Sequence, residues 1–480
     1  MSRTSSFILL VFAFLLGLFV VRSEPEKKGS FIVTTAVEKE PWPIKLGMRM
    51  LILRSRIPTV DRVVLVPDEA TFLKAIQQWS LDGRWPILIE DDRYTPIFLR
   101  RFEPKETIRL PAVTEPLPEG EERRSAAQAA VASTWNAEDF ASLQETWAQL
   151  GWKPPGVAIA SAKDPAWPAA VALAAAWGQP LVFLPDFFGK PNDSLSPKQW
   201  QNLQKKVEGA VAKTGYSYRQ LGDEIDTVTI VRQLAVKYES PQNPKQDWAV
   251  TDGLGRHENG ERWAAIGWIY GSAERSLYQA MCSIFLDPDN VLFYDSYPPE
   301  EPWNDYAVGL AKYYFNKVGF KVKVVQRPEA SQKTWRELAA EGFNFDLIFT
   351  NSKGMPNSFA VGGDRYGSVR DIPKLLTPAA IHFIHSWSAT TPDDPNTIAG
   401  RWLEKGAYAY VGSVHEPYLS AFITPTLMTR RLLLSAPFLI SARQLNFSPW
   451  KITTIGDPLM MLTQTRRRLP PTAAPLTGEF

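Results

Sequence analysis

The sequence predicts an α/β protein with two doubly wound, mostly parallel sheet domains. Short apolar runs with strand character alternate with segments of helical spacing through both halves of the chain. Several of these helical segments follow Asp, Asn or Ser and end at Gly, as helix caps do. The chain has 480 residues and is 45% hydrophobic. At roughly 100 to 200 residues per domain, that length predicts two or three cores.

The first folded region is expected at residues 31–240. Its predicted strands are residues 62–66, 86–90, 107–110, 157–161, 180–184 and 227–231. Its predicted helices are residues 69–80, 137–150, 165–177 and 197–214. Alternating strands and helices favour a parallel sheet that is covered on both faces. Residues 115–125 interrupt the alternation and are expected to form an exposed loop.

Residues 241–262 are polar and contain Pro, which predicts a linker to a second domain at residues 263–463. The predicted strands of this domain begin with residues 291–295, 321–326 and 345–350, and its predicted helices are residues 274–285, 304–317 and 331–341. It continues with AAIHFIHSWSATT, NTIAGRWLEKG and AYAYVGSVHEPYL, an order typical of a strand–helix–strand unit, and then IGDPLM. The Pro-rich residues 464–480 are expected to be a disordered tail.

The N-terminus has the pattern of an export signal. Arg3 supplies the positive charge, residues 7–21 are an apolar run, and Val21-Arg22-Ser23 offers a cleavage site. The run is shorter than the about 20 residues of a membrane-spanning helix. Residues 1–23 are therefore interpreted as a cleaved signal peptide in preference to an uncleaved signal anchor. The protein is expected to be periplasmic, on the cell surface or secreted, with membrane contact only through this segment if it is uncleaved.

The composition argues against several functions. With 53 basic and 51 acidic side chains there is no excess charge to attract nucleic acid. Neither GxGxxG nor GxxxxGK[ST] follows a predicted strand, so no nucleotide cofactor is expected. Cys282, the single cysteine, lies in an apolar helical pattern and is expected to be buried and inert.

Polar side chains gather where three strands of the second domain are predicted to end. Carboxyl ends of parallel strands share one sheet edge, where ligands collect in open α/β sheets. The sequence therefore predicts a ligand-binding crevice. Its expected lining is Asn351, Ser352, Lys353, His385, Trp387 and Ser413, with Ser386, Ser388, His415 and Glu416 as candidate catalytic residues.

Two interpretations of the candidate catalytic residues remain open. In the first, Ser386 or Ser388 is a nucleophile and His415 is its base. Glu416 or Asp394 would then orient the base. In the second, the same side chains satisfy backbone groups at the strand ends. The absence of a Gly-x-Ser-x-Gly elbow favours the second interpretation.

Other patterns near the crevice have less specific interpretations. A metal site formed by His385, His415 and Glu416 is an alternative, but the spacing matches no zinc motif, so no metal is expected. Strand alternation places His382 on the face opposite His385, toward a helix. The helical spacing of Trp402 predicts a core position, whereas Trp387 is a candidate for stacking on a ligand.

The connection at residues 352–371 is long enough to act as a lid. Within it, Asp364 and Arg365 are interpreted as members of a solvated turn.

The segments PAAIHFIHSWSA, GRWLEKGAYAYVGSVHEPYL and GDPLM resemble a group of uncharacterised exported bacterial proteins. More distantly, their order is similar to the gingipain-like cysteine peptidases, and that resemblance implies a caspase-like sheet between helices. It also implies a His after DLIFT and a Cys after IHFIH. This chain instead has Asn351-Ser352-Lys353-Gly354 and His385-Ser386-Trp387-Ser388 there, so the thiolate–imidazole dyad is missing.

In the N-terminal half, DRVVLVPDEATFLKAIQQWSLDGRWPILIEDD and GVAIASAKDPAWPAAVALAAAWGQPLVFLP resemble bacterial cell-wall-binding repeats. Together these patterns predict an exported, envelope-associated binding or scaffold protein that lacks the Cys/His dyad and takes an envelope or peptide ligand. The alternative is a hydrolase that uses Ser386 or Ser388 with His415.

Overall fold

The computed structural model describes residues 31, 37–241, 243–363, 365–445, 451–462 and 467–476. The predicted export signal, residues 1–23, and Asp364 lie outside this part of the chain. Within the described residues, no helix combines the length and the apolar character needed to cross a membrane.

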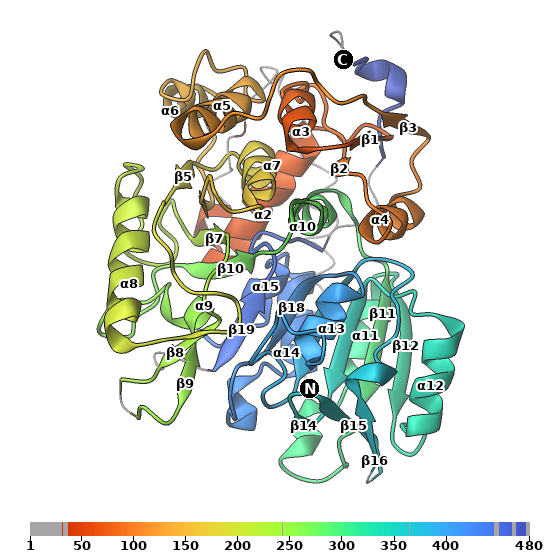
Figure 1. Cartoon of the computed structure of the whole chain (residues 1–480). Coiled ribbons are helices and arrows are strands. Elements are labelled where there is room, and N and C mark those ends of the chain that lie inside the picture. The colour runs from red at the N-terminus through yellow and green to blue at the C-terminus, as the bar shows by residue number, and fades with distance from the viewer. Residues whose placement is uncertain are drawn as a thin grey trace.

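The described chain contains three parallel sheets with helices packed between and around them (Figure 1). The first sheet has the order β2 (Ile87–Ile89), β1 (Arg62–Val66), β3 (Glu106–Arg109). The second has the order β10 (Ala265–Ile269), β7 (Thr227–Val231), β4 (Gly156–Ala160), β5 (Leu181–Phe183). The mostly parallel α/β class is confirmed, but the N-terminal region forms two sheets where one was expected.

The third sheet has six strands, and its edge strand β19 is antiparallel to β18 while the other pairs are parallel. Its order is β12 (Lys321–Gln326), β11 (Asn290–Asp295), β13 (Leu347–Asn351), β17 (Ala379–Ile384), β18 (Ala407–Ser413), β19 (Ile452–Ile455). Two small sheets contain β14 (Gly354–Met355), β15 (Ser358–Gly362) and β16 (Arg365–Ser368), and β6 (Ser194–Leu195), β8 (Lys237–Glu239) and β9 (Asp247–Ala249).

Helices of the N-terminal half cover the first two sheets. They are α2 (Trp42–Arg56), α3 (Glu69–Ile76), α4 (Tyr94–Phe102), α5 (Gly120–Ser133), α6 (Leu143–Gln149), α7 (Trp167–Trp177), α8 (Pro197–Ala212) and the short α9 (Val250–Gly253). Helix α5 begins inside residues 115–125, which were expected to be a loop. Glu121 and Glu122 in its first turn suit the positive end of the helix dipole, and its buried Ala127 and Ala130 face the core.

Helix α10 (Ala273–Phe285) lies at the centre of the molecule and touches α7, β2, α4 and β18, so it contacts all three parallel sheets or their helices (Figure 1). Every residue of α7 is buried, and its run of alanines lets α10 approach closely. Cys282 lies in α10 and is 1% exposed. Burial raises the pKa of its thiol well above the usual value, which confirms the expected buried and inert position.

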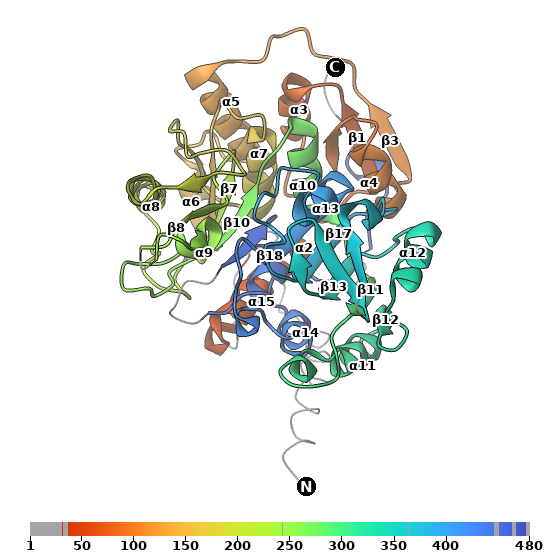
Figure 2. The same ribbon diagram turned by 60° about the horizontal axis from the view of Figure 1, so that its bottom comes forward.

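Helices cover both faces of the third sheet (Figure 2). The side chains that alternate along its strands pack into two different cores. Phe293 and Phe349 lie in one core with α11 (Gly309–Lys317), α14 (Pro425–Leu433) and α15 (Phe438–Ser441). Ile381 and Phe383 lie in the other with α12 (Gln332–Glu341) and α13 (Ile398–Glu404). Trp402 of α13 is fully buried there, as predicted.

Strand β10 follows the expected linker, yet it pairs along its length with β7 of the second sheet. Gly456 beside β19 donates its N–H to the carbonyl of Trp268 in β10, so the second and third sheets meet through their backbones. A Cβ at Gly267 would lie 2.4 Å from the Gly456 carbonyl oxygen. The expected boundary between residues 262 and 263 therefore does not coincide with a division between sheets.

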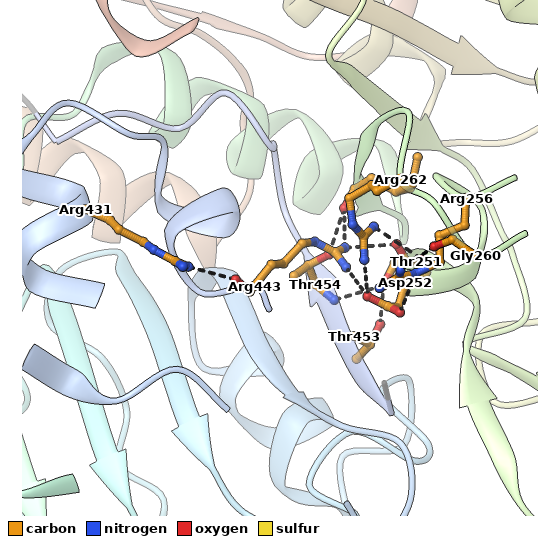
Figure 3. Close-up of polar contacts among 10 residues, drawn as sticks. Thr251, Asp252, Arg256, Gly260, Arg262, Arg431, Arg443, Thr453 and Thr454 are labelled. Atoms are coloured by element: carbon orange, nitrogen blue, oxygen red, sulfur yellow. Dashed lines mark hydrogen bonds and ion pairs between the residues drawn. The ribbon is translucent and has the colours of Figure 1, made fainter. Parts of the chain in front are cut away.

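A buried arginine cluster, defined as Asp252, Arg256, Arg262 and Arg443, joins the same two sheets (Figure 3). The Asp252 carboxylate accepts from Arg262 at 2.5 Å, and from Arg443 and Arg256 at 3.2 Å each. Arg443 also donates to the carbonyls of Thr251 and Ile266. Burial is the largest cause that lowers the pKa of Arg443, to about 9.

Residues 467–476 fall in the expected disordered tail, but they pack against the first sheet. Leu469 donates to the carbonyl of Thr59 and accepts from Asp61, whose carboxylate also pairs with Arg468 at 3.1 Å. Arg62 of β1 donates to the carbonyls of Pro471 and Ala474. This part of the tail is thus held by hydrogen bonds at the start of the chain's first strand.

Candidate functional site

The carboxyl ends of five parallel strands lie along one edge of the third sheet (Figure 2). Asn351 pairs with Asp295 on one side and with Ile384, the residue before His385, on the other. Trp387 donates its N–H to the carbonyl of His415 at 3.4 Å. The structure therefore brings together the three groups of side chains that the sequence placed at these strand ends.

Four inner side chains of this edge are almost completely buried, and each donates a hydrogen bond to a backbone carbonyl of a connecting segment. Their exposed fractions are 0–1%. The bonds are Asn351 to Tyr306 at 2.8 Å, Ser352 to Ala360 at 2.9 Å, His385 Nε2 to Ser358 at 2.9 Å, and Ser413 to Lys451 at 3.2 Å. These side chains hold in place the segments that cover the strand ends.

Ser388 is also fully buried. Its hydroxyl oxygen accepts the Ser413 N–H at 3.3 Å, and a Cβ at Gly412 would lie 2.4 Å from it. A hydroxyl that is fully buried and packed this closely against β18 has no space for a substrate, so the position does not suit the nucleophile that the hydrolase interpretation requires.

Ser386, His415 and Glu416 lie nearer the surface. The Ser386 hydroxyl donates to Glu416 Oε1 at 2.9 Å. His415 Nδ1 accepts the N–H of Glu416 at 2.8 Å, so in the neutral ring the proton resides on Nε2. Partial burial, and then the charge of Lys451, lower the pKa of His415. In the described part of the chain, no hydrogen bond joins a serine hydroxyl to an imidazole nitrogen.

The remaining expected members of the site, Asp394, Lys353 and Trp387, make contacts of other kinds. Asp394, the alternative group to orient the base, accepts the N–H of Asn396 in its own loop at 2.8 Å. Lys353 is exposed, with its Nζ 6.0 Å from the ring centroid of Trp303. Trp387 has a positive φ of 53°, a left-handed conformation that costs a non-glycine residue of order 1–3 kcal/mol. Its half-buried ring lies 5.9 Å from that of His415.

The two buried histidines of β17 and its end are neutral at pH 7. His382 packs between Phe349 and Phe422, and neither of its ring nitrogens has a partner in the described chain, which confirms that it faces away from the crevice. Burial lowers the pKa of His382 to about 3. Burial likewise lowers the pKa of His385 to about 4.

Among the described residues, no group of three or more His, Cys, Asp and Glu side chains is arranged to hold a metal ion. His385, one of the alternative metal ligands, has its Nε2 on the Ser358 carbonyl. The segment at residues 352–371, expected as a lid, contains strands β14, β15 and β16, and Phe359 anchors it in the core.

Asp295 is a member of the strand-end cluster that the sequence interpretation did not select. It ends β11, is 8% exposed, and accepts the N–H of Tyr297 at 3.1 Å. Burial raises its pKa, against the opposing hydrogen bonds from Tyr297 and Asn351. The sequence did contain a signal for this residue. Asp295 is the last residue of a predicted strand, and Asn351, which was selected, directly follows another.

Comparison with known proteins gave distant structural likenesses. No family model and no curated protein matches the sequence. Among solved structures, the chain is similar to the Arg-specific cysteine proteinase gingipain R (RGPB), with 12% identity, 64% of this chain and 78% of that chain covered, and a TM-score of 0.43. A second similar structure, described as a protease, has 11% identity, 66% and 80% coverage, and a TM-score of 0.41.

A third similar structure is the complex of Porphyromonas gingivalis RgpB pro- and mature domains, with 10% identity, 64% and 79% coverage, and a TM-score of 0.40. These values are too low to transfer the role of any residue. The chemistry assigned to each side chain above therefore rests on its own contacts. The expected likenesses to exported bacterial proteins and to cell-wall-binding repeats stay predictions.

Proposed function

We propose that the protein is an exported, envelope-associated binding or scaffold protein whose third sheet does not catalyse peptide hydrolysis. One observation supports this most directly: the inner side chains at the strand ends already donate to carbonyls of the covering segments. A catalytic group must instead have a hydroxyl or imidazole nitrogen that can reach a substrate.

The residues nearer the surface, Ser386, His415 and Glu416, also favour a binding role. Ser386 donates to a carboxylate, and the Nδ1 lone pair of His415 accepts a backbone N–H. The Ser386 hydroxyl therefore faces an exposed carboxylate in place of the imidazole base that the hydrolase interpretation requires. The proposal of export rests on the sequence of residues 1–23 alone, and that of an envelope location follows from it.

Labelling of the purified full chain with a fluorophosphonate probe tests the absence of serine catalysis. We expect no adduct at Ser386 or Ser388, by mass spectrometry of tryptic peptides, under conditions in which a serine hydrolase control is labelled completely. The matched control is Ser386→Ala. An adduct at Ser386 that this variant lacks would contradict the proposal and favour the hydrolase that uses His415.

Two further measurements test the cellular part of the proposal. Sequencing the N-terminus of the protein recovered from its cells should show that residues 1–23 have been removed. Purified protein should sediment with peptidoglycan or with envelope fractions. Recovery of the intact N-terminus in the cytosolic fraction would contradict export, and a protein that stays in the supernatant would contradict envelope binding.

A further inference from the structure

A cavity of about 420 Å³ lies beside the outer edge of β5, in the second sheet. Helices α5 and α6 lie above β5 in Figure 1, and α8 lies to the left. The walls include Arg124 of α5, Leu143 and Trp147 of α6, and Lys213 and Tyr216 after α8, while residues 180–183 form the floor. Its volume falls in the range of about 300–1,000 Å³ that is usual for ligand sites.

The floor of this cavity is an unpaired strand edge. β5 pairs with β4, and the bonds from Ala158 to Pro180 and from Leu184 to Ala160 fix the register. Because alternate residues of a parallel strand bond to the same neighbour, the backbone groups of Leu181 and Phe183 point away from β4. Gln128 donates to the Leu181 carbonyl at 3.2 Å. No other hydrogen bond reaches these outward groups in the described residues.

Three side chains that line the cavity carry polar hydrogens without an acceptor in the described chain. They are Arg124 at Nε, Trp147 at Nε1 and Tyr216 at its hydroxyl. Trp147 is only 2% exposed. A buried donor without a partner destabilises a fold by about 1–3 kcal/mol. These three atoms are themselves buried in the wall, so the features that favour a ligand are the outward backbone groups of β5 and the charges at the cavity.

The charges around the cavity favour an anionic group on that ligand. Arg124 shares the Glu121 carboxylate at 2.8 Å. Lys213 is exposed at the rim, and no ion pair involves it in the described part of the chain. The two cations outnumber the one carboxylate among the lining residues.

We propose that the cavity binds an extended peptide that pairs with β5 as an added strand and places a carboxylate side chain near Lys213 and Arg124. The peptide carbonyls supply acceptors, and the outward N–H and C=O groups of Phe183 supply main-chain pairing. This site is separate from the strand ends of the third sheet, so it does not depend on whether those catalyse a reaction.

The test begins with an array of acetylated heptapeptides in which valine alternates with varied residues, made in pairs that differ only by Glu or Gln. We expect binders among them, with the Glu member tighter by about tenfold in fluorescence polarisation, which corresponds to about 1.4 kcal/mol. N-methylation of the amides on one alternate set should abolish binding, while the other set tolerates it, because only one edge of the peptide faces β5. An array without binders, or equal effects of the two N-methylated sets, would overturn the proposal.

Variants of β5 and its rim locate the binding. Phe183→Pro removes the outward N–H without removing a bond to β4, a change that edge strands tolerate. Its matched control, Phe183→Leu, keeps the N–H. We expect Phe183→Pro to lose about tenfold or more in affinity and Phe183→Leu to lose little. Equal binding by both would overturn pairing with β5, and thermal unfolding verifies that both are folded.

Charge reversal separates the carboxylate contact from main-chain pairing. Lys213→Glu should weaken binding of the Glu peptides and leave the Gln peptides unchanged, whereas Lys205→Glu, on α8 but outside the lining, should change neither. The same loss for Glu and Gln peptides would overturn the assigned carboxylate. These outcomes concern only the β5 cavity, so a failure here is distinguishable from labelling of Ser386.

Discussion

The strand ends of the third sheet and the edge of β5 both present polar groups beside a parallel sheet, but they differ in what those groups contact. At the strand ends, Asn351, Ser352 and His385 donate to carbonyls of the chain itself. Beside β5, the outward backbone groups of Phe183 lie next to an open cavity and have no partner in the described residues. Position at a strand end therefore does not by itself identify a binding site, whereas an unpaired strand edge beside a cavity favours one.

The arginine cluster is a third place where polar groups are buried. It differs from the other two because its buried groups are charged. Asp252→Ala should lower the free energy of unfolding by about 3–5 kcal/mol, since it leaves buried arginines without their carboxylate. Urea unfolding measures this change. The control is Glu337→Ala, which removes an exposed pair with Lys333 and should change stability by less than about 1 kcal/mol. Similar effects of the two variants would contradict the role assigned to Asp252.

Acidification should break the closed strand ends. His385 has a folded pKa of about 4, below its ordinary value, so the unfolded chain binds more protons between these values. The contribution of the neutral His385 ring to the free energy of unfolding is complete above about pH 6.5. It is lost as the pH falls toward 4, and the loss amounts to about 3 kcal/mol at about 1.4 kcal/mol per unit of pKa difference.

Urea unfolding at a series of pH values from 7 to 4 measures this loss. His385→Gln keeps a donor for the Ser358 carbonyl but cannot take up the proton, so its stability should depend less steeply on pH. His382 titrates in the same direction, from a pKa of about 3, and remains in both proteins. An identical slope for the variant and the parent would contradict the prediction.

Within the strand-end edge, buried and exposed polar groups should respond differently to removal. Asn351→Leu leaves the Tyr306 carbonyl without its donor and should cost about 1–3 kcal/mol. Ser386→Ala removes an exposed hydroxyl and should change stability by no more than about 0.5 kcal/mol. Thermal unfolding compares the two, and a larger loss for Ser386→Ala would reverse the assignment.

The smallest effects are expected at the β5 cavity in the absence of a ligand. Tyr216→Phe removes a hydroxyl donor that has no acceptor in the described residues, so it loses no hydrogen bond. We expect its stability to be within about 0.5 kcal/mol of the parent, or slightly higher. A loss of several kcal/mol from Tyr216→Phe in urea unfolding would show that its hydroxyl is already satisfied, and would weaken the comparison.

The strands were predictable from apolar runs or from alternation. Residues 62–66 match β1, which is buried along its length, and residues 321–326 match the edge strand β12, in which Lys and Val alternate. Which strands share a sheet could not be predicted, because the pairing of β10 with β7 depends on tertiary packing and not on any local sequence pattern. Helix α5 was missed because its acidic first turn follows a Pro-rich stretch that is typical of a loop.

The sequence predicted that the strand-end residues lie together, but it did not predict what their side chains contact. Convergence of residues 351, 385 and 413 follows from strand alternation and parallel pairing. The acceptors of these side chains could not be predicted, because the Tyr306 carbonyl comes from a connection 45 residues away along the chain. The cavity beside β5 was also beyond prediction, since its walls come from α5, α6, α8 and β5, which only the folded chain assembles.

Because residues 467–476 contact the first sheet, the order in which the chain is synthesised differs from the order in which its contacts can form. Arg62 contacts partners that are 409 and 412 residues farther along the sequence. During translation, Arg62 therefore cannot complete these two contacts until the end of the chain leaves the ribosome, although N-terminal regions usually fold first. Formation of the first sheet with all its contacts must follow synthesis of nearly the whole chain.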